Sequence, residues 1–401
     1  MMKRSVISIS LFAGILFSGS LRAQDTRAQY PKFMSNSYFG VNIGYIDYPF
    51  GSYSLEPGYT VETVQVPHVA VRLMLIGHQF NKNLSAQVSY MRPVNWVQYK
   101  SINGDHRSHS VWMNVGGLTV RQRIHLAGKL YTYAEAGLGV VTRSGFKVNN
   151  VPVVKDASYA SILLGTGLQY QINQKWGLLL SGTWSPKTDK AKQPRTLFLS
   201  AGFNYYLRPL SAERVKRNSS ETTGNHFPHQ LIQAGYSTNA FGYGINHFVS
   251  EGAIPIFWGG DAVVKSGLHL NYQRNVYHSR RVFALDWGTS LGIWTSRRDG
   301  QHFFAVSVYP LMRFTFLRSK SADFFFNYSV AGPSYISKVI IDGAETGKHF
   351  TFQDFMGAGM FAGKERKFNA ELRIGHYSNG NVFSQNAGVK VPLTFNLGYA
   401  F

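Results

Sequence analysis

The chain has 401 residues, of which 44% are hydrophobic and 15% aromatic, and a formal net charge of +21. This length suffices for two or three ordinary domains or one large barrel, and the excess of Lys and Arg favours anionic partners such as nucleic acid, phosphorylated lipid or an acidic surface. No Walker, zinc-finger or RNA-recognition motif supports nucleic acid, and the lack of Cys excludes disulfides, a thiol nucleophile and a lipoprotein anchor.

The N-terminus has the features of a secretory signal peptide. Lys3 and Arg4 precede an apolar run that ends at Phe17, and small residues follow up to L-R-A-Q. We expect cleavage near Ala23, so that residues 1–23 are removed. The run is too short for a membrane anchor, and no later run approaches the ~20 apolar residues of a spanning helix. The mature chain is therefore predicted to be a soluble all-β protein or a transmembrane β-barrel.

Alternation of residue type decides between these two classes. Segments of about ten residues carry one apolar face and one small or polar face, as at 39–45, 68–75, 130–140 and 197–205. This is the pattern of a membrane barrel strand, with lipid outside and a polar lumen inside. A strand of a soluble sandwich would also alternate, so the number of segments carries the prediction. Eight of them are expected between about 36 and 207.

The connections between these segments alternate in length. Tight turns are predicted at 80–83, 125–129 and 172–175. Longer loops are predicted at 47–65, 99–107, 143–157 and 186–195. Short turns at one end and long loops at the other are typical of outer-membrane barrels, and an even strand number returns the chain to the periplasm.

A linker and a second set of strands follow. Residues 208–228 are polar, charged and without periodicity, which predicts a periplasmic linker. About eight further strands are expected from 229 to 401, and the last alternates aromatics up to Phe401, which resembles the assembly signal of outer-membrane barrels. Short turns are predicted near 275–281, 317–322 and 363–366, and long loops near 242–259, 295–301, 336–350 and 379–388.

The predicted fold is all-β: two transmembrane antiparallel eight-stranded barrels in tandem, at 35–207 and 229–401. One sixteen-stranded, porin-like barrel is the alternative, and the linker argues against it. Eight strands leave an interior that side chains just fill. The inward charged residues would then pair inside the lumens: Arg72, Glu135, Glu371 and Arg373.

A histidine and a serine end the seventh strand of the second barrel. Within K-F-N-A-E-L-R-I-G-H-Y-S, residues 367–378, period two places His376 and Ser378 on the apolar, lipid-facing side. Side chains two apart on a strand are neighbours, so their polar atoms could act on one substrate atom.

Topology predicts the level of these two residues in the membrane. The second barrel starts in the periplasm, so its seventh strand ends beside the outer leaflet. That leaflet in a Gram-negative cell is lipopolysaccharide, whose lipid A carries phosphates and ester-linked acyl chains. A serine activated by a neighbouring histidine is an ester-cleaving arrangement. The simpler interpretation, which spacing alone favours, is that polar residues mark the point where the strand leaves the bilayer.

The motif resembles a known family. H-Y-S-N-G at 376–380, followed by Q-N-A-G-V at 385–389, is similar to the lipid A 3-O-deacylase family (PagL-like, also called acyloxyacyl hydrolase). The resemblance covers roughly 229–401. It implies an eight-stranded outer-membrane barrel with a His-x-Ser-Asn motif near the C-terminus and active-site side chains turned to the lipid. The first half resembles the OmpA/OmpW-like barrel group, which implies no activity.

The resemblance assigns roles to three residues. His376 would be the general base and Ser378 the nucleophile, and Asn379 with its neighbouring backbone would stabilise the oxyanion. No cofactor or metal ligand is implied.

The sequence departs from the family at the third member of the triad. Lys390 stands where the family commonly has Glu, and a cation can neither accept the imidazole N–H nor stabilise an imidazolium. Either Asn386 or Gln385 orients His376 through a small register shift before Pro392, or the site is degenerate and Lys390 binds a lipid phosphate.

The sequence therefore predicts a serine esterase in the outer membrane of a Gram-negative bacterium that removes an ester-linked acyl chain from lipid A. Its expected partners are outer-leaflet lipopolysaccharide and the membrane, not nucleic acid. A catalytically inactive structural or interaction barrel is the alternative.

Overall fold

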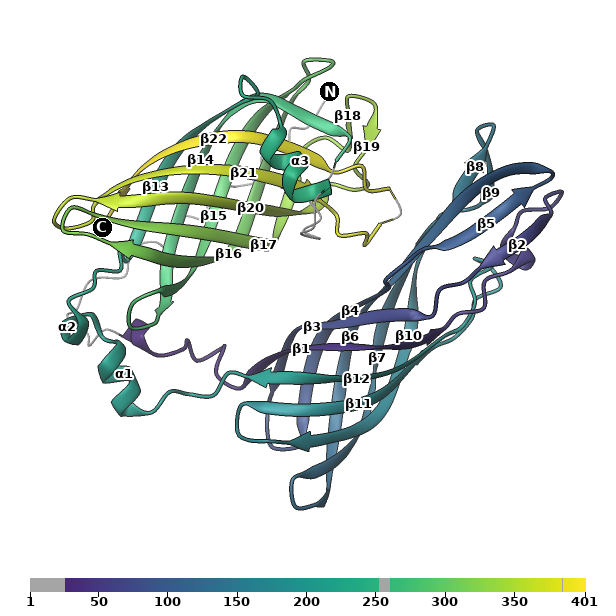
Figure 1. The fold of residues 1–401 in the computed structure, drawn as a ribbon, viewed down its shortest axis with the longest axis horizontal. Coiled ribbons are helices and arrows are strands. Elements are labelled where there is room, and N and C mark those ends of the chain that lie inside the picture. The colour runs from purple at the N-terminus through teal and green to yellow at the C-terminus, as the bar shows by residue number, and fades with distance from the viewer. Residues whose placement is uncertain (1–25, 252–259, 384) are drawn as a thin grey trace, which may run out of the picture.

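The computed structural model describes residues 26–251, 260–383 and 385–401. Most of the regular structure consists of antiparallel strands arranged in two separate rings (Figure 1). The predicted signal peptide lies outside the described residues. Residues 252–259 of the predicted loop at 242–259 also lie outside them. No helix in the described parts of the chain is long and apolar enough to cross a membrane.

The first ring has eight strands, and each pairs with its neighbours until β12 pairs back with β1. In order around the ring they are β1 (Ser37–Asp47), β3 (Val69–Gln79), β4 (Leu84–Pro93), β6 (Asp105–Ala127), β7 (Leu130–Ser144), β10 (Ala157–Gln171), β11 (Trp176–Ser185) and β12 (Thr196–Tyr206). The connections between them are short at one end and long at the other, as the sequence predicted.

The long connections of the first ring are more ordered than predicted. The stretches expected as loops contain β2 (Val61–Gln65), β5 (Val97–Ile102), β8 (Phe146–Val148) and β9 (Val151–Val154), besides the 3-10 turn η3 (Ser52–Ser54). The long connections predicted at 99–107 and 143–157 are present, and they contain strands because they bury their own apolar cluster, which includes Tyr48, Tyr99 and Val153. The strands therefore continue beyond the ~9–11 residues that cross a bilayer.

The second ring is a closed eight-stranded barrel. In order around the ring its strands are β13 (Gln230–Thr238), β14 (Ala262–His278), β15 (Phe283–Ser296), β16 (His302–Arg318), β17 (Ala322–Ile336), β20 (Phe350–Ala362), β21 (Phe368–Ser378) and β22 (Val389–Ala400). Helix α3 (Gly244–Glu251) and the hairpin β18 (Ile340–Ile341) and β19 (Ala344–Glu345) belong to its long connections. Two separate rings confirm the tandem fold and exclude the sixteen-stranded alternative.

The segment between the rings is partly helical. It contains α1 (Ala212–Asn218) and α2 (Ser220–Thr223), and a 3-10 turn, η2 (Thr26–Ala28), lies close to α1 and β14. Ser211 caps α1 because its side chain accepts a hydrogen bond from the backbone N–H of Arg214. The prediction of a segment without periodic structure therefore missed two short helices.

Paired charges fill both lumens. In the first, Glu135 accepts from Arg72 at 2.5 Å and from Arg121 at 3.2 Å, and all three side chains are buried. In the second, Arg373 pairs with Glu371 at 2.7 Å. Both predicted pairs are confirmed, and their burial follows from the narrow interior of an eight-stranded barrel.

Candidate active site on the outer face of the second barrel

Strand β21 has the two faces that period two predicts. Asn369, Glu371 and Arg373 are buried in the lumen, whereas Phe368 and Leu372 are 48% and 47% exposed on the outer face. By the same alternation His376 and Ser378 lie on the outer face, at the end of the strand that leads into a long connection. His376 and Ser378 therefore follow Phe368 and Leu372 along the outer face of β21.

His376 is only 2% exposed although it lies on the outer face. Helix α3 crosses this part of the barrel wall, and its Val249 packs in one apolar cluster with Ile374, the residue next below His376 on the outer face (Figure 1). The Asn246 side chain fixes the helix by donating to the backbone carbonyl of Val391 at 3.0 Å. Ser378 is partly exposed. The histidine is thus shielded beside a more accessible serine.

Asp354 on β20 is the acidic neighbour of His376. The two residues are direct cross-strand partners, and Asp354 Oδ2 lies 3.8 Å from His376 Nδ1. The other carboxylate oxygen accepts the backbone N–H of Ala331, which has a φ of +54° in a bulge of β17. His376 Nδ1 has no hydrogen-bond partner within the described residues. One carboxylate oxygen is therefore anchored, and the other faces the imidazole.

The sequence prediction of the third group missed Asp354. A signal was present, because Asp354 interrupts the apolar face formed by Phe350, Phe352 and Met356 on β20. The short turn between β20 and β21 sets the pairing that brings this aspartate opposite His376.

Lys390 lies on the other side of His376. A bulge at 392–393 shifts the register of β22, so that Arg373 pairs with Thr394 but Gly375 pairs with Val391. The shift places Lys390, instead of Val391, directly opposite His376. The register shift that the sequence suggested near Pro392 is present, and it brings the lysine to the histidine. His376 therefore stands between a carboxylate on β20 and a cation on β22.

The amide groups after Ser378 organise the β21–β22 connection. The backbone N–H of Asn379 donates to Asn386 Oδ1 at 2.8 Å, and Asn386 Nδ2 donates to Asn381 Oδ1 at 2.7 Å. Asn379 Nδ2 donates to the backbone carbonyls of Thr346 and Gln385.

These bonds bear on two sequence hypotheses. Both polar atoms of the Asn386 side chain bind within the loop, so they are not directed at His376. The backbone carbonyl of Gln385 accepts from Asn379 Nδ2. The donors of Asn379 are likewise engaged, so its oxyanion role stays a prediction that requires them to be released by the substrate.

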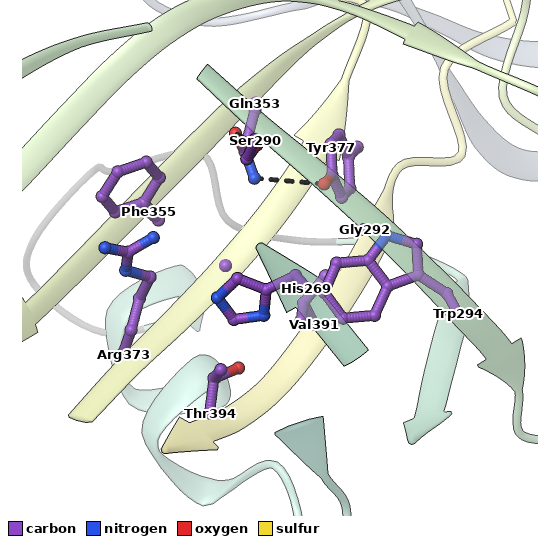
Figure 2. Close-up of a pocket in the computed structure, with 11 residues that line it drawn as sticks. His269, Ser290, Gly292, Trp294, Gln353, Phe355, Arg373, Tyr377, Val391 and Thr394 are labelled. Carbon is purple, nitrogen blue, oxygen red and sulfur yellow. Dashed lines mark hydrogen bonds between the residues drawn. The ribbon is translucent and has the colours of Figure 1, made fainter. Parts of the chain in front are cut away.

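The lumen of the second barrel holds a small cavity among the described residues. Its cavity has a volume of about 20 Å³, which is room for about one water molecule. Figure 2 shows His269, Arg373 and Trp294 around this space, with Gln353 Nε2 donating to the Tyr377 hydroxyl at 3.1 Å. No cluster of metal-ligating side chains occurs among the described residues. This cavity is therefore too small to hold an acyl chain.

The fold defines a transmembrane β-barrel protein with two barrels. Residues 266–400 match the family model described as lipid A 3-O-deacylase (PagL), and residues 35–213 match the model described as OmpA-like transmembrane domain. Both resemblances inferred from the sequence are thereby confirmed. The chain is a protein of the Gram-negative outer membrane, and its second barrel is similar to the lipid A 3-O-deacylase family over residues 266–400.

Solved structures similar to this chain are outer-membrane barrels. The outer-membrane enzyme PagL is 16% identical over 43% of this chain and 98% of its own, with a TM-score of 0.29. Neisserial surface protein A is 18% identical over 43% and 97%, with a TM-score of 0.29. The N-terminal barrel of Pseudomonas aeruginosa OprF is 16% identical over 43% and 98%, with a TM-score of 0.28. Among curated proteins, none matches the chain.

Proposed function

We propose that the second barrel hydrolyses an ester-linked acyl chain of lipid A in the outer leaflet. The observation that carries this proposal is the alignment of Ser378, His376 and Asp354 on the outer face of β20 and β21, with a carboxylate oxygen 3.8 Å from an otherwise unpartnered imidazole nitrogen. A nucleophile, a base and an orienting acid in this order are the parts of a serine hydrolase.

The proposed reaction begins with attack of Ser378 Oγ on the ester carbonyl carbon. His376 takes the hydroxyl proton through Nε2, and Asp354 stabilises the resulting imidazolium through Nδ1–H. Collapse of the tetrahedral intermediate breaks the ester C–O bond, and His376 returns the proton to the departing sugar oxygen. Water then releases the fatty acid from Ser378 by the same steps.

In this mechanism Lys390 binds a phosphate of lipid A. Lys390 pairs with His376 across β21 and β22, at the end of the wall proposed to face the outer leaflet, where the phosphates of lipid A are abundant anions. A phosphate bound there would hold the substrate and reduce the positive potential that the lysine imposes on His376.

The same lysine supports a second candidate function, an inactive barrel protein that only binds lipopolysaccharide. Lys390 provides a cation for a lipid phosphate at the position where a hydrolase of this type would have an acidic group.

Mass spectrometry of lipid A separates the two candidates. Cells that express the wild type, Ser378→Ala or the control Ser321→Ala, an exposed serine in the β16–β17 turn, are compared. We expect loss of one acyl chain with the wild type and the control but not with Ser378→Ala. The same acyl pattern for all three proteins and for cells without the protein would refute the esterase.

A further inference from the structure

Three polar residues interrupt the lipid-facing wall of the first barrel. Asn114 on β6, Thr142 on β7 and Ser158 on β10 are cross-strand partners in one row, here called the docking row. Further along the same strand faces the side chains are apolar and more than a third exposed, as at Leu118, Val140 and Ile162. The docking row therefore lies on the outer face, just beyond the apolar band.

Two of the three residues of the docking row are buried, and Ser158 is exposed. Asn114 is 3% exposed and Thr142 is 0% exposed, although Leu118 and Val140 on the same strand faces are open. The cover is the β21–β22 connection of the second barrel, the segment that follows Ser378. Asn114 Nδ2 donates to the carbonyl of Asn381 at 3.1 Å. The carbonyl of Val382 accepts from Thr142 at 3.1 Å and from Ser158 at 3.2 Å.

The connection has a backbone suited to this contact. Gly380 and Asn381 both have positive φ, +61° and +58°, which turns the chain sharply after the strand. Carbonyl groups without partners are costly beside hydrocarbon. The donors of the docking row satisfy two of them, the carbonyls of Asn381 and Val382.

A chain of hydrogen bonds links the docking row to the nucleophile. Asn114 binds the backbone of Asn381, the Asn381 side chain accepts from Asn386, and Asn386 accepts the backbone N–H of Asn379. Asn379 is the residue directly after Ser378. Hydrogen bonds therefore connect the first barrel wall, through one loop, to the residue next to the serine.

We propose that the outer wall of the first barrel is a docking surface for residues 379–383 of the second barrel and holds Ser378 in place. Asn114, Thr142 and Ser158 are positioning residues, since they touch the loop and not the reacting atoms. The contact itself is independent of any activity, and its effect on hydrolysis rests on the proposed function. The first barrel then serves the second as a fixed support within the same chain.

Cross-linking tests the contact without reference to activity. The chain has no Cys, so a single engineered pair reports alone. Ser158→Cys with Val382→Cys joins the docking row to the loop, and a protease site in α2 allows the two barrels to be separated after oxidation in membranes. The control pair is Tyr45→Cys with Val382→Cys, because Tyr45 is 52% exposed on β1, across the ring from β7.

The expected result is that the cleaved barrels stay joined on a non-reducing gel only for the Ser158 pair. Equal joining of the two pairs, or none in either, would overturn the docking surface. If the Ser158 pair joins but the wild type removes no acyl chain, the docking surface stands and the esterase fails.

Two substitutions of Thr142 test whether its hydroxyl positions Ser378. Thr142→Val keeps the shape of the side chain but removes its donor, and Thr142→Ser keeps the donor. We expect Thr142→Val to lower the turnover number of the purified full chain about tenfold with KM unchanged, and Thr142→Ser to retain it. Thr142→Val with wild-type turnover, or a loss that Thr142→Ser shares, would refute positioning by this hydroxyl. If the barrels are cross-linked but Thr142→Val has wild-type turnover, the contact exists and this hydroxyl does not position Ser378.

Discussion

Replacing Asp354 by Asn tests the electrostatic part of the proposed site. The change keeps the size of the side chain and its contact with Ala331 but removes the negative charge that faces His376. A full charge on each group at the observed 3.8 Å interacts by about 4 kcal/mol at an effective dielectric constant of ~20. If that stabilisation is present only when the imidazolium forms, turnover should fall about 10³-fold.

Release of fatty acid from purified lipid A by the detergent-solubilised protein measures this effect. Asp299→Asn is the matched control, because Asp299 is an exposed aspartate whose side chain pairs with Arg298. We expect the control to keep its turnover and Asp354→Asn to keep its KM within a few-fold. A fall of less than tenfold for Asp354→Asn would show that this carboxylate is not the group that supports His376.

Three further changes test other parts of the molecule. Lys390→Glu should raise turnover at least tenfold in the same assay, because an acidic residue opposite His376 replaces a cation. An unchanged or lower rate would contradict the register that places Lys390 opposite His376. Glu135→Gln should lower the unfolding free energy by about 3–5 kcal/mol in urea titrations followed by the mobility of the folded barrel, since two buried arginines lose their partner; an unshifted midpoint would refute it. Burial acts to raise the pKa of Asp342, but hydrogen bonds from Ser296 and two backbone N–H groups hold that pKa below its ordinary value. The ionised carboxylate therefore stabilises its loop above about pH 4, and this stabilisation is lost as the pH falls. Pepsin should therefore cut the β17–β20 connection faster at pH 2 than at pH 4, and Asp342→Asn should remove the difference.

The period-two patterns were sufficient to predict the two rings and the direction of each side chain. They placed Arg72 and Glu135 in one lumen and Glu371 and Arg373 in the other, because alternation along a strand is a local property. They also placed His376 and Ser378 on the outer face. The same reasoning could not show which strand residues oppose His376, since β20, β21 and β22 meet through pairing that a bulge in β22 alters.

Other features of the site depend on contacts between segments far apart in the sequence. The docking row and the loop it binds are separated by more than 200 residues, so no local pattern relates Ser158 to Val382. Helix α3 was predicted as a loop because its apolar residues face two environments: Val249 packs on the barrel wall, whereas Ile245 and Phe248 are 55% and 71% exposed. The helix spans only eight residues, Gly244–Glu251, which is too short for apolar periodicity to be distinguished from a loop in the sequence.

The two charges beside His376 point to the substrate as part of the site. A carboxylate oxygen of Asp354 lies 3.8 Å from His376 Nδ1, and Lys390 pairs with His376 from the strand on the other side. A lipid A phosphate on Lys390 would cancel the opposing charge and leave the stabilising one. Catalysis would then be strongest on a phosphorylated lipid, because binding of the anion and activation of the histidine occur at one lysine. This arrangement accounts for a cation at the position where a carboxylate would otherwise give the histidine permanent support. It also requires that Lys390→Glu, while raising turnover, should abolish the preference for phosphorylated over dephosphorylated lipid A.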